Sequence, residues 1–274
     1  METVQRTCGC KGVRTCLVCE NLRHKRNRGN VVSRYEKPSS VKYFCRLCNK
    51  AWTDQMHDTH VTSNDTDCID FPGVCILEKF VSEAEEADIV KEMDKSQWKD
   101  SQSGRRKQDY GPKVNFKKQK VNHSTFCGLP AFSELILNRM VQHDCVEDFE
   151  VVEQCNLDYD PERGSSIDAH FDDFWLWGER LVTLNLLSDT YLTMTKPGLD
   201  FCVDIPLPRR SFLVLYGPAR FEWLHAIHRE AITSRRIAIT FRELSTEFSR
   251  GGPRADVGNT LIEIARNFTG SVVL

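Results

Sequence analysis

The stretch Arg236-Ile-Ala-Ile-Thr-Phe-Arg242 decides the fold, because polar or small residues alternate with apolar ones along it. Such alternation predicts a half-buried β-strand, with Arg236, Ala238, Thr240 and Arg242 on one face and only apolar residues on the other. At ~3.3 Å per residue the two arginine Cα atoms lie roughly 20 Å apart. Two converging arginine side chains, each reaching about 6 to 7 Å, leave a gap of about 6 to 8 Å. Because guanidinium groups grip carboxylates through paired hydrogen bonds, this face predicts a clamp for a five-carbon dicarboxylate. A solvated strand face is the alternative.

Short β-type runs separated by turn residues accompany this strand, and helices are expected on both sides of them. Regularly spaced short strands indicate a double-sheet architecture such as a jelly roll. A capping box at Ser82 begins one helix, and two more are expected at Pro130–Val141 and about Ala255–Phe268. The predicted class is therefore α+β, a double-stranded β-helix (jelly-roll) core with flanking helices. The expected strands are Phe149–Val152, Leu181–Leu187, Phe201–Ile205, Phe212–Tyr216, Phe221–Ile227 and Arg236–Phe241.

His170-Phe-Asp172 is a candidate metal-binding step. Alternate side chains of an extended segment share a face, so the imidazole and the carboxylate point into the same space while Asp173 faces away. Two histidines and one carboxylate on one face of a metal are typical of non-haem Fe(II) oxygenases. The second histidine is expected to be His225, which a strand places on the aromatic face, and not His228. If that segment were instead a helix, both histidines would lie on one side and a zinc site would be conceivable.

The composition is ordinary for a globular protein, with 274 residues, 28% charged residues and a net charge of −2. The first 50 residues are different, because they hold twelve Lys or Arg against three acids. A basic arm indicates a negatively charged partner or a solvated tail. No stretch approaches the roughly 20 apolar residues that cross a bilayer, and the N-terminus lacks the apolar run of a signal peptide. A nuclear and cytoplasmic location is therefore expected.

Eight of the twelve cysteines fall between Cys8 and Cys75. In a reducing compartment such a concentration favours metal binding over disulfides. The spacing of the first four is suited to one tetrahedral zinc ion, although a set of unligated reduced thiols is the alternative. Residues 1–70 are thus predicted to form a basic, Cys-rich zinc module, and residues 71–274 the catalytic domain. The expected ligands are Cys8, Cys10, Cys16 and Cys19, with Cys45, Cys48, His57 and His60 as other options.

A basic run over residues 104–120 has Tyr110 and Phe116 interleaved among its Lys and Arg residues. In a nucleic-acid enzyme such a run grips phosphates and stacks a base. It would equally suit docking to an acidic protein, or it is a solvated loop. The sequence leaves these three readings open.

Between about Phe71 and Phe248 the chain resembles the AlkB-type dioxygenases. The resemblance rests on the block from Asn156 to Asp172, on the aromatic setting of His225, and on the paired arginines six residues apart. It implies a catalytic iron site of His170, Asp172 and His225, with Fe(II), 2-oxoglutarate and O₂ as cofactor and co-substrates. It further implies that Arg236 binds the distal carboxylate of 2-oxoglutarate and Arg242 the end nearer the iron, and that Asn156 and Tyr159 add hydrogen bonds to it.

Further segments resemble the fourth AlkB homologue subfamily more specifically, among them Cys8-Gly-Cys10-Lys-Gly and Thr240-Phe-Arg-Glu-Leu-Ser245. That resemblance implies oxidative removal of N-methyl groups, released as formaldehyde. The implied partners are methylated protein, with methyl-lysine on actin, and methylated DNA, with methylated adenine. The competing readings are a zinc-dependent nucleic-acid-binding module without dioxygenase activity and a zinc hydrolase, for which no H-E-x-x-H motif is present.

Overall fold

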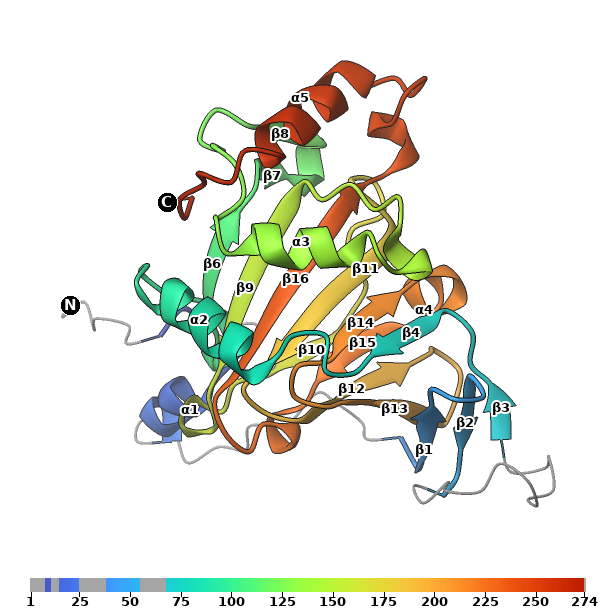
Figure 1. Cartoon of the computed structure of the whole chain (residues 1–274). Coiled ribbons are helices and arrows are strands. Elements are labelled where there is room, and N and C mark those ends of the chain that lie inside the picture. Colours follow the sequence, from blue (N-terminus) through green and yellow to red (C-terminus); the bar gives the residue numbers. More distant parts are fainter. Residues whose placement is uncertain (1–7, 11–14, 25–37, 55–67, 274) are drawn as a thin grey trace.

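The computed structural model describes residues 8–10, 15–24, 38–54 and 68–273, which form two seven-stranded sheets, a small hairpin and covering helices (Figure 1). Sheet A has the order β10 (Ile167–His170), β15 (Leu224–Ile227), β12 (Thr190–Thr195), β13 (Phe201–Leu207), β1 (Ser40–Cys45), β2 (Lys50–Trp52) and β3 (Cys68–Asp70). Sheet B has the order β4 (Val74–Leu77), β14 (Phe212–Leu215), β11 (Trp177–Leu186), β16 (Arg236–Leu244), β9 (Glu153–Tyr159), β6 (Arg106–Tyr110) and β5 (Lys99–Asp100).

The two sheets pack face to face, and helices cover the outer face of sheet B (Figure 1). One buried cluster joins Leu192 and Val203 of sheet A to Leu181 and Leu213 of sheet B. A second cluster packs the outer face of sheet B against helices. This layered α+β arrangement is consistent with the predicted jelly roll. The helices are α1 (Leu17–His24), α2 (Glu83–Asp94), α3 (Ser133–Met140), α4 (Gly217–Phe221) and α5 (Ala255–Ala265).

Strand β16 has the alternation that its sequence predicts. Ile237, Ile239 and Phe241 are fully buried in the layer between sheet B and the helices. Arg236 and Arg242 point to the opposite side, into a cavity between the sheets. Since β16 pairs with β11 on one side and β9 on the other, it lies inside the sheet, and both arginines are held on a rigid element.

Two strand predictions were wrong, and the basic run is more ordered than a loop. The run Phe149–Val152 is a loop that leads into β9, in which Phe149, Val151 and Val152 are buried and Glu150 is exposed. The run Phe221–Ile227 is divided between the end of α4 and strand β15, so only its second half is extended. The basic run is not one loop: it contains strand β6 and the hairpin β7 (Lys113–Asn115) and β8 (Lys120–Asn122), and Tyr110 is buried.

The described part of residues 1–70 is joined to the catalytic core. Strand β1 pairs in parallel with β13, from Ser40 opposite Phe201 to Tyr43 opposite Asp204. Strands β2 and β3 continue the same sheet. The sequence-based boundary at residue 70 therefore does not coincide with a break in the structure. Among the described helices, none has the length and apolar character needed to cross a membrane.

Helix α2 begins with the capping box that the sequence predicts. The Glu85 backbone N–H donates to Ser82 Oγ at 3.2 Å, and the Ser82 N–H donates to Glu85 Oε2 at 2.7 Å. Arg139 of α3 also donates to both carboxylate oxygens of Glu85, at 3.0 and 2.7 Å. The hydrogen bonds from Arg139 lower the pKa of Glu85 to about 2. The pair thus ties α2 to α3 over sheet B.

We expect Glu85→Gln to destabilise the protein by about 1 kcal/mol near neutral pH, because the amide keeps the cap but loses the ion pair. A carboxyl group whose pKa is lower in the folded state stabilises the fold at pH values above its pKa in the unfolded chain. That stability is lost as the pH falls through the pKa of the folded state. The difference in the free energy of unfolding between variant and wild type should therefore have its full size above pH 4.5, the ordinary pKa of a glutamate, and should vanish as the pH approaches 2. Denaturant unfolding across that range measures it.

Glu92→Gln is the matched control, since Glu92 pairs with Lys95 on the exposed face of the same helix. It should change stability little at any pH. A Glu85→Gln loss that stays constant down to the acid end would contradict the ion-pair explanation.

Candidate metal centre and co-substrate cavity

His170, Asp172 and His225 come together at the edge of sheet A. Strands β10 and β15 are antiparallel neighbours, and their register places His170 opposite His225. The two imidazole rings have centroids 4.3 Å apart, and His170 Nε2 lies 3.6 Å from Asp172 Oδ1. One potential ligand atom from each of the three residues lies within 4.8 Å of the others. The structure thus assembles the two histidines and one carboxylate that the sequence indicates.

The protonation states of these groups suit a divalent cation. The His170 ring contacts the Asp168 carbonyl oxygen through Nδ1 at 2.8 Å. Since a carbonyl only accepts, Nδ1 is the donor of this contact, and Nε2 faces Asp172. Burial, with the neighbouring His170, lowers the pKa of His225 to about 3, so His225 is neutral. Burial alone would raise the pKa of Asp172, but Arg242 and His170 hold it well below its usual range.

This donor set fits Fe(II). Two neutral imidazoles and one carboxylate are the ligands that non-haem Fe(II) oxygenases present on one face of the metal. His228 does not belong to this group: it follows β15 as the residue before a short 3-10 turn, η6 (Arg229–Ala231). Of the two aromatic residues expected on the same strand face as His225, Phe221 instead belongs to α4, whereas Trp223 is buried as an inward-facing residue should be.

Arg242 lies beside the metal-binding group. Its Nε donates to Asp172 Oδ2 at 2.7 Å, and its Nη1 donates to Glu153 Oε2 at 2.5 Å. Its guanidinium also stands over the Trp177 ring at 5.5 Å from the centroid. Burial would lower the pKa of Arg242, but the two carboxylates raise it well above its usual value. Arg242 is therefore a permanent cation fixed next to Asp172.

Arg236 occupies the other end of the same face, where no residue that the structure describes gives it an anionic partner. Its side chain is 2% exposed, and its Nε donates to Asn185 Oδ1 at 2.6 Å. The guanidinium lies 4.8 Å from the centroid of the buried Tyr159 ring. Among the described residues, no carboxylate lies within ion-pair distance of Arg236, and its Nη1 has no hydrogen-bond partner. A buried guanidinium with an unpaired nitrogen is costly unless an anion binds it.

A cavity between the two sheets connects these groups. His170, Asp172 and His225 line it together with Arg236 and Arg242. The rest of its wall is mostly small or apolar and consists of Ala238, Thr240, Thr183, Tyr159, Ile167, Ile227, Leu157, Leu181, Leu192, Leu207, Leu213 and Leu215. A mostly apolar cavity with a few converging polar groups is the usual form of a small-molecule site.

The two residues expected to assist 2-oxoglutarate binding lie on different faces of β9. Tyr159 lines the cavity. Asn156 is fully buried on the opposite face, where its Nδ2 donates to Gln108 Oε1 at 3.0 Å and its Oδ1 accepts from Gln154 at 2.9 Å. Because odd and even positions of a strand face opposite ways, Asn156 cannot reach the cavity from this register. We therefore remove Asn156 from the candidate co-substrate ligands.

Arg220 is a residue of the site that the sequence did not reveal. Its side chain is 1% exposed, and its Nη atoms donate to the backbone oxygens of Asp172 and Asp173, each at 3.1 Å. It therefore fixes the chain immediately after β10. A single arginine in the short helix α4 has no period or motif around it, so only the packing identifies it.

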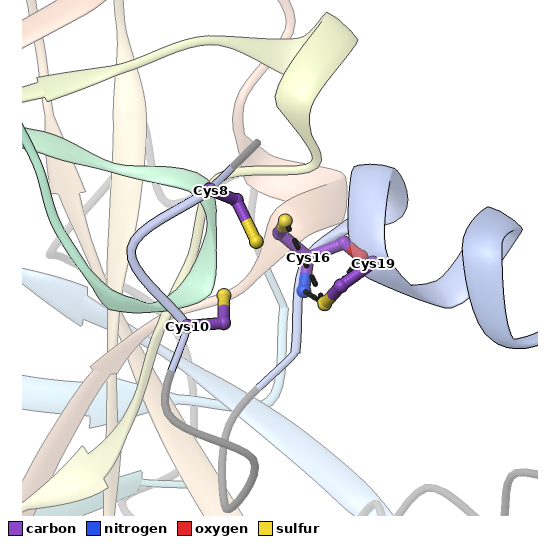
Figure 2. A group of neighbouring side chains, drawn as sticks. All are labelled: Cys8, Cys10, Cys16 and Cys19. Atoms are coloured by element: carbon purple, nitrogen blue, oxygen red, sulfur yellow. Dashed lines mark hydrogen bonds between the residues drawn. The ribbon is translucent and has the colours of Figure 1, made fainter. Parts of the chain in front are cut away.

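Cys8, Cys10, Cys16 and Cys19 form a second group of potential metal ligands. Their sulfur atoms all lie within 4.8 Å of one another and face a common space between residues 8–10 and the start of α1 (Figure 2). Cys45 and Cys48 do not join this group, and Trp52 donates to the Cys48 sulfur at 3.4 Å. The other two options, His57 and His60, lie outside the described residues.

His225→Ala should abolish stoichiometric Fe(II) binding, because the metal loses one of three protein ligands. His228→Ala is the matched control and should bind iron normally, since His228 lies outside the metal-binding group. Anaerobic reconstitution followed by iron analysis of the desalted protein measures both. An iron-free His228 variant beside an iron-loaded His225 variant would overturn the assignment.

Arg236→Met should raise the apparent KM for 2-oxoglutarate by about thirtyfold or more. Losing one partner of a buried charge pair costs roughly 2 to 5 kcal/mol, and every ~1.4 kcal/mol is tenfold in affinity. Iron content should not change, because Arg236 contacts none of the three metal-binding residues. Succinate formation at varied 2-oxoglutarate is the measurement, and an unchanged KM would show that the distal carboxylate binds elsewhere.

Comparison with known proteins identifies the family. No family model matches the chain. The chain is 47% identical to the human protein named alpha-ketoglutarate-dependent dioxygenase alkB homolog 4, over 98% of this chain and 97% of that one. It is 35% identical to a Caenorhabditis elegans protein named DNA N6-methyl adenine demethylase, over 92% and 91% of the two chains. A solved structure described as that of OsALKBH1 covers 63% of this chain and 98% of its own, with a TM-score of 0.46 and 13% identity, which is too distant to add to the assignment.

The human relative is decisive, because the match extends over nearly the full length of both chains. Its name uses alpha-ketoglutarate as the synonym of 2-oxoglutarate. This chain therefore belongs to the AlkB family of 2-oxoglutarate-dependent dioxygenases.

Proposed function

We propose that this chain is an oxidative demethylase that removes N-methyl groups with Fe(II), 2-oxoglutarate and O₂. The observation that carries the proposal is the buried Arg236 guanidinium with an unpaired Nη1, in one cavity with the metal-binding group. A dicarboxylate bound there presents one carboxylate to Arg236 and its keto-acid end to the metal-binding group. When bound, the iron supplies the oxidation that couples decarboxylation of 2-oxoglutarate to hydroxylation of the methyl carbon.

Each residue of the cavity has a share in this reaction. His170, Asp172 and His225 hold the metal. Arg242 keeps Asp172 ionised, so that Asp172 can be the anionic ligand of the metal. Arg236 and Tyr159 orient the distal end of 2-oxoglutarate. The apolar wall excludes water, which strengthens these charge interactions. The N–C bond of the resulting hydroxymethyl group then breaks: its carbon leaves as formaldehyde, and its hydroxyl proton passes to the nitrogen, which becomes the free amine.

Methylated adenine in DNA is the substrate that we propose. The C. elegans relative is named for that activity. On the β7–β8 hairpin, Lys113, Lys117, Lys118 and Lys120 are exposed, and Phe116 is 44% exposed. The Phe116 ring lies 6.5 Å from Trp177, over which Arg242 stands. The hairpin therefore offers positive charge for phosphates and an aromatic ring for a base beside the cavity. Methyl-lysine in a protein such as actin is the competing substrate.

A structural zinc ion belongs to the same proposal. Four thiolates around zinc at Zn–S distances of about 2.3 Å bring their sulfurs to about 3.8 Å from one another. The sulfurs of Cys16 and Cys19 are 3.9 Å apart. Burial raises the pKa of Cys16 to about 12, so a cation is needed to hold it as a thiolate. A reducing compartment such as the nucleus or the cytoplasm would keep these thiols available for the metal.

Formaldehyde should be released from an N6-methyladenine oligonucleotide in step with succinate, whereas a monomethyl-lysine peptide should give none above background.

A Lys117→Glu, Lys118→Glu double variant should weaken DNA binding. It should also lower the slope of log affinity against log salt concentration by about 1 for each lost phosphate contact. Lys91→Glu is the matched control, because Lys91 is exposed on α2, away from the hairpin.

Release from the peptide alone would contradict DNA as the substrate and leave demethylation standing. Release from neither substrate, with 2-oxoglutarate still converted to succinate, would contradict demethylation of both classes.

A further inference from the structure

The cysteine group packs against a strained turn of the core. In the 3-10 turn η2 (Gln102–Gly104), Ser103 and Gly104 have φ of 55° and 74°, in the left-handed region. Such a conformation is costly for serine and persists only where its surroundings fix it. The backbone of Ser103 and Gly104 lies beside the Cys10 sulfur, where it lowers the pKa of that thiol against the raising effect of burial. A Cβ on Gly104 would lie 3.1 Å from Cys16 Cβ, so the turn touches both halves of the cysteine group.

The same turn is tied to the loop that leads into β10. The Gly104 carbonyl oxygen accepts from Arg163 Nε and from Ser165 Oγ, both at 2.7 Å. The Ser166 N–H donates to the Ser103 carbonyl at 3.0 Å. Ser166 immediately precedes β10, which ends at the metal-binding His170. A continuous set of contacts therefore runs from Cys10 to the strand that carries His170.

Helix α1, which begins between Cys16 and Cys19, reaches both strands of the metal-binding pair. Leu17 packs on the loop before β10, where a Cβ on Gly164 would come within 2.5 Å of Leu17 Cγ. Glu20 accepts two hydrogen bonds from Arg229, at 3.0 and 3.1 Å. Arg229 follows β15, the strand that carries His225. The helix thus bridges the ends of β10 and β15 that lie away from the metal-binding residues.

These contacts matter because β10 is an edge strand. Sheet A begins with β10, whose neighbour in that sheet is β15, and the register shifts between Ile167 and His170. Strand pairing therefore fixes His170 from one side only. Helix α1 has 8 residues, and helices below about 12 residues are marginal without tertiary support. A metal ion bound by the four cysteines would join Cys8 and Cys10 to the start of α1 and would supply that support.

We infer that the zinc ion held by the four cysteines is a clamp on β10 and β15 that sets the affinity of the iron site. The inference rests on the zinc ion and the iron ligands of the proposed function. Its residues are positioning residues: Cys10 acts through the Ser103–Gly104 turn, and Glu20 acts through Arg229. The clamp predicts that losing zinc weakens Fe(II) binding at a site to which no cysteine belongs.

The test is an anaerobic titration of the full chain with Fe(II) in the presence of 2-oxoglutarate. Binding is monitored by the visible absorption of the complex between Fe(II) and 2-oxoglutarate. Zinc is measured in the same samples by elemental analysis. Cys16→Ser should lose zinc and weaken Fe(II) binding by about tenfold or more, the usual effect of removing outer support from a metal site. Glu20→Gln should keep zinc yet weaken Fe(II) binding, by a smaller factor. Cys127→Ser, at an exposed cysteine outside the group, should change neither.

Unchanged Fe(II) affinity in Cys16→Ser and Glu20→Gln would overturn the clamp, and so would a purified wild-type chain without zinc. Should Cys16→Ser fail to fold, Glu20→Gln decides alone, with hydrogen exchange of residues 167–170 as its second readout. Faster exchange there with zinc retained supports the clamp, and unchanged exchange overturns it. No methylated substrate is present, so failure of the demethylase proposal leaves this result interpretable.

Discussion

The ion pair between Arg242 and Asp172 is the interaction on which the site depends. Burial would neutralise an isolated carboxyl group, yet Asp172 must remain an anion to bind a divalent cation. The Arg242 Nε at 2.7 Å achieves this inside the sandwich. Buried ion pairs contribute little net stability compared with apolar side chains of the same size, whereas breaking one costs about 3 to 5 kcal/mol. The presence of the Arg242–Asp172 pair at this position is therefore explained by the proposed metal site and not by folding.

The architecture serves to hold these charges in place. Strand β16 carries both arginines on one face, while its apolar face anchors it against the helices. Sheet A brings the histidines across the cavity on β10 and β15. The two ends of the cavity have different electrostatics: Arg242 is neutralised by carboxylates, whereas Arg236 is not. Among the described residues the Arg236 guanidinium has no carboxylate partner, and in the proposed function it binds the distal carboxylate of 2-oxoglutarate.

Strict local patterns in the sequence predicted the parts of the fold that depend on local geometry. The alternation over residues 236–242 gave both the strand and its cavity face, and the capping box gave the start of α2. The prediction for Asn156 was wrong because resemblance to a motif does not show which face of the strand a residue occupies. A shift of one residue along a strand moves a side chain to the other face. Arg220 was missed, and the burial of Tyr110 was not expected. In both cases the burial of a single polar residue depends on packing against distant parts of the chain. The joining of β1 to β13 is likewise a non-local pairing without a signal in either segment.

The central claim is that one ligand spans the cavity, bound by Arg236 at one end and by a metal at the other. Equilibrium dialysis of 2-oxoglutarate with and without Fe(II), under anaerobic conditions, tests it most directly. If one ligand spans both groups, Fe(II) must tighten 2-oxoglutarate binding, and 2-oxoglutarate must tighten Fe(II) binding by the same factor. Asp172→Asn should remove that coupling while leaving the weaker, Arg236-dependent binding. Equal affinity for 2-oxoglutarate with and without Fe(II) in the wild type would contradict the account.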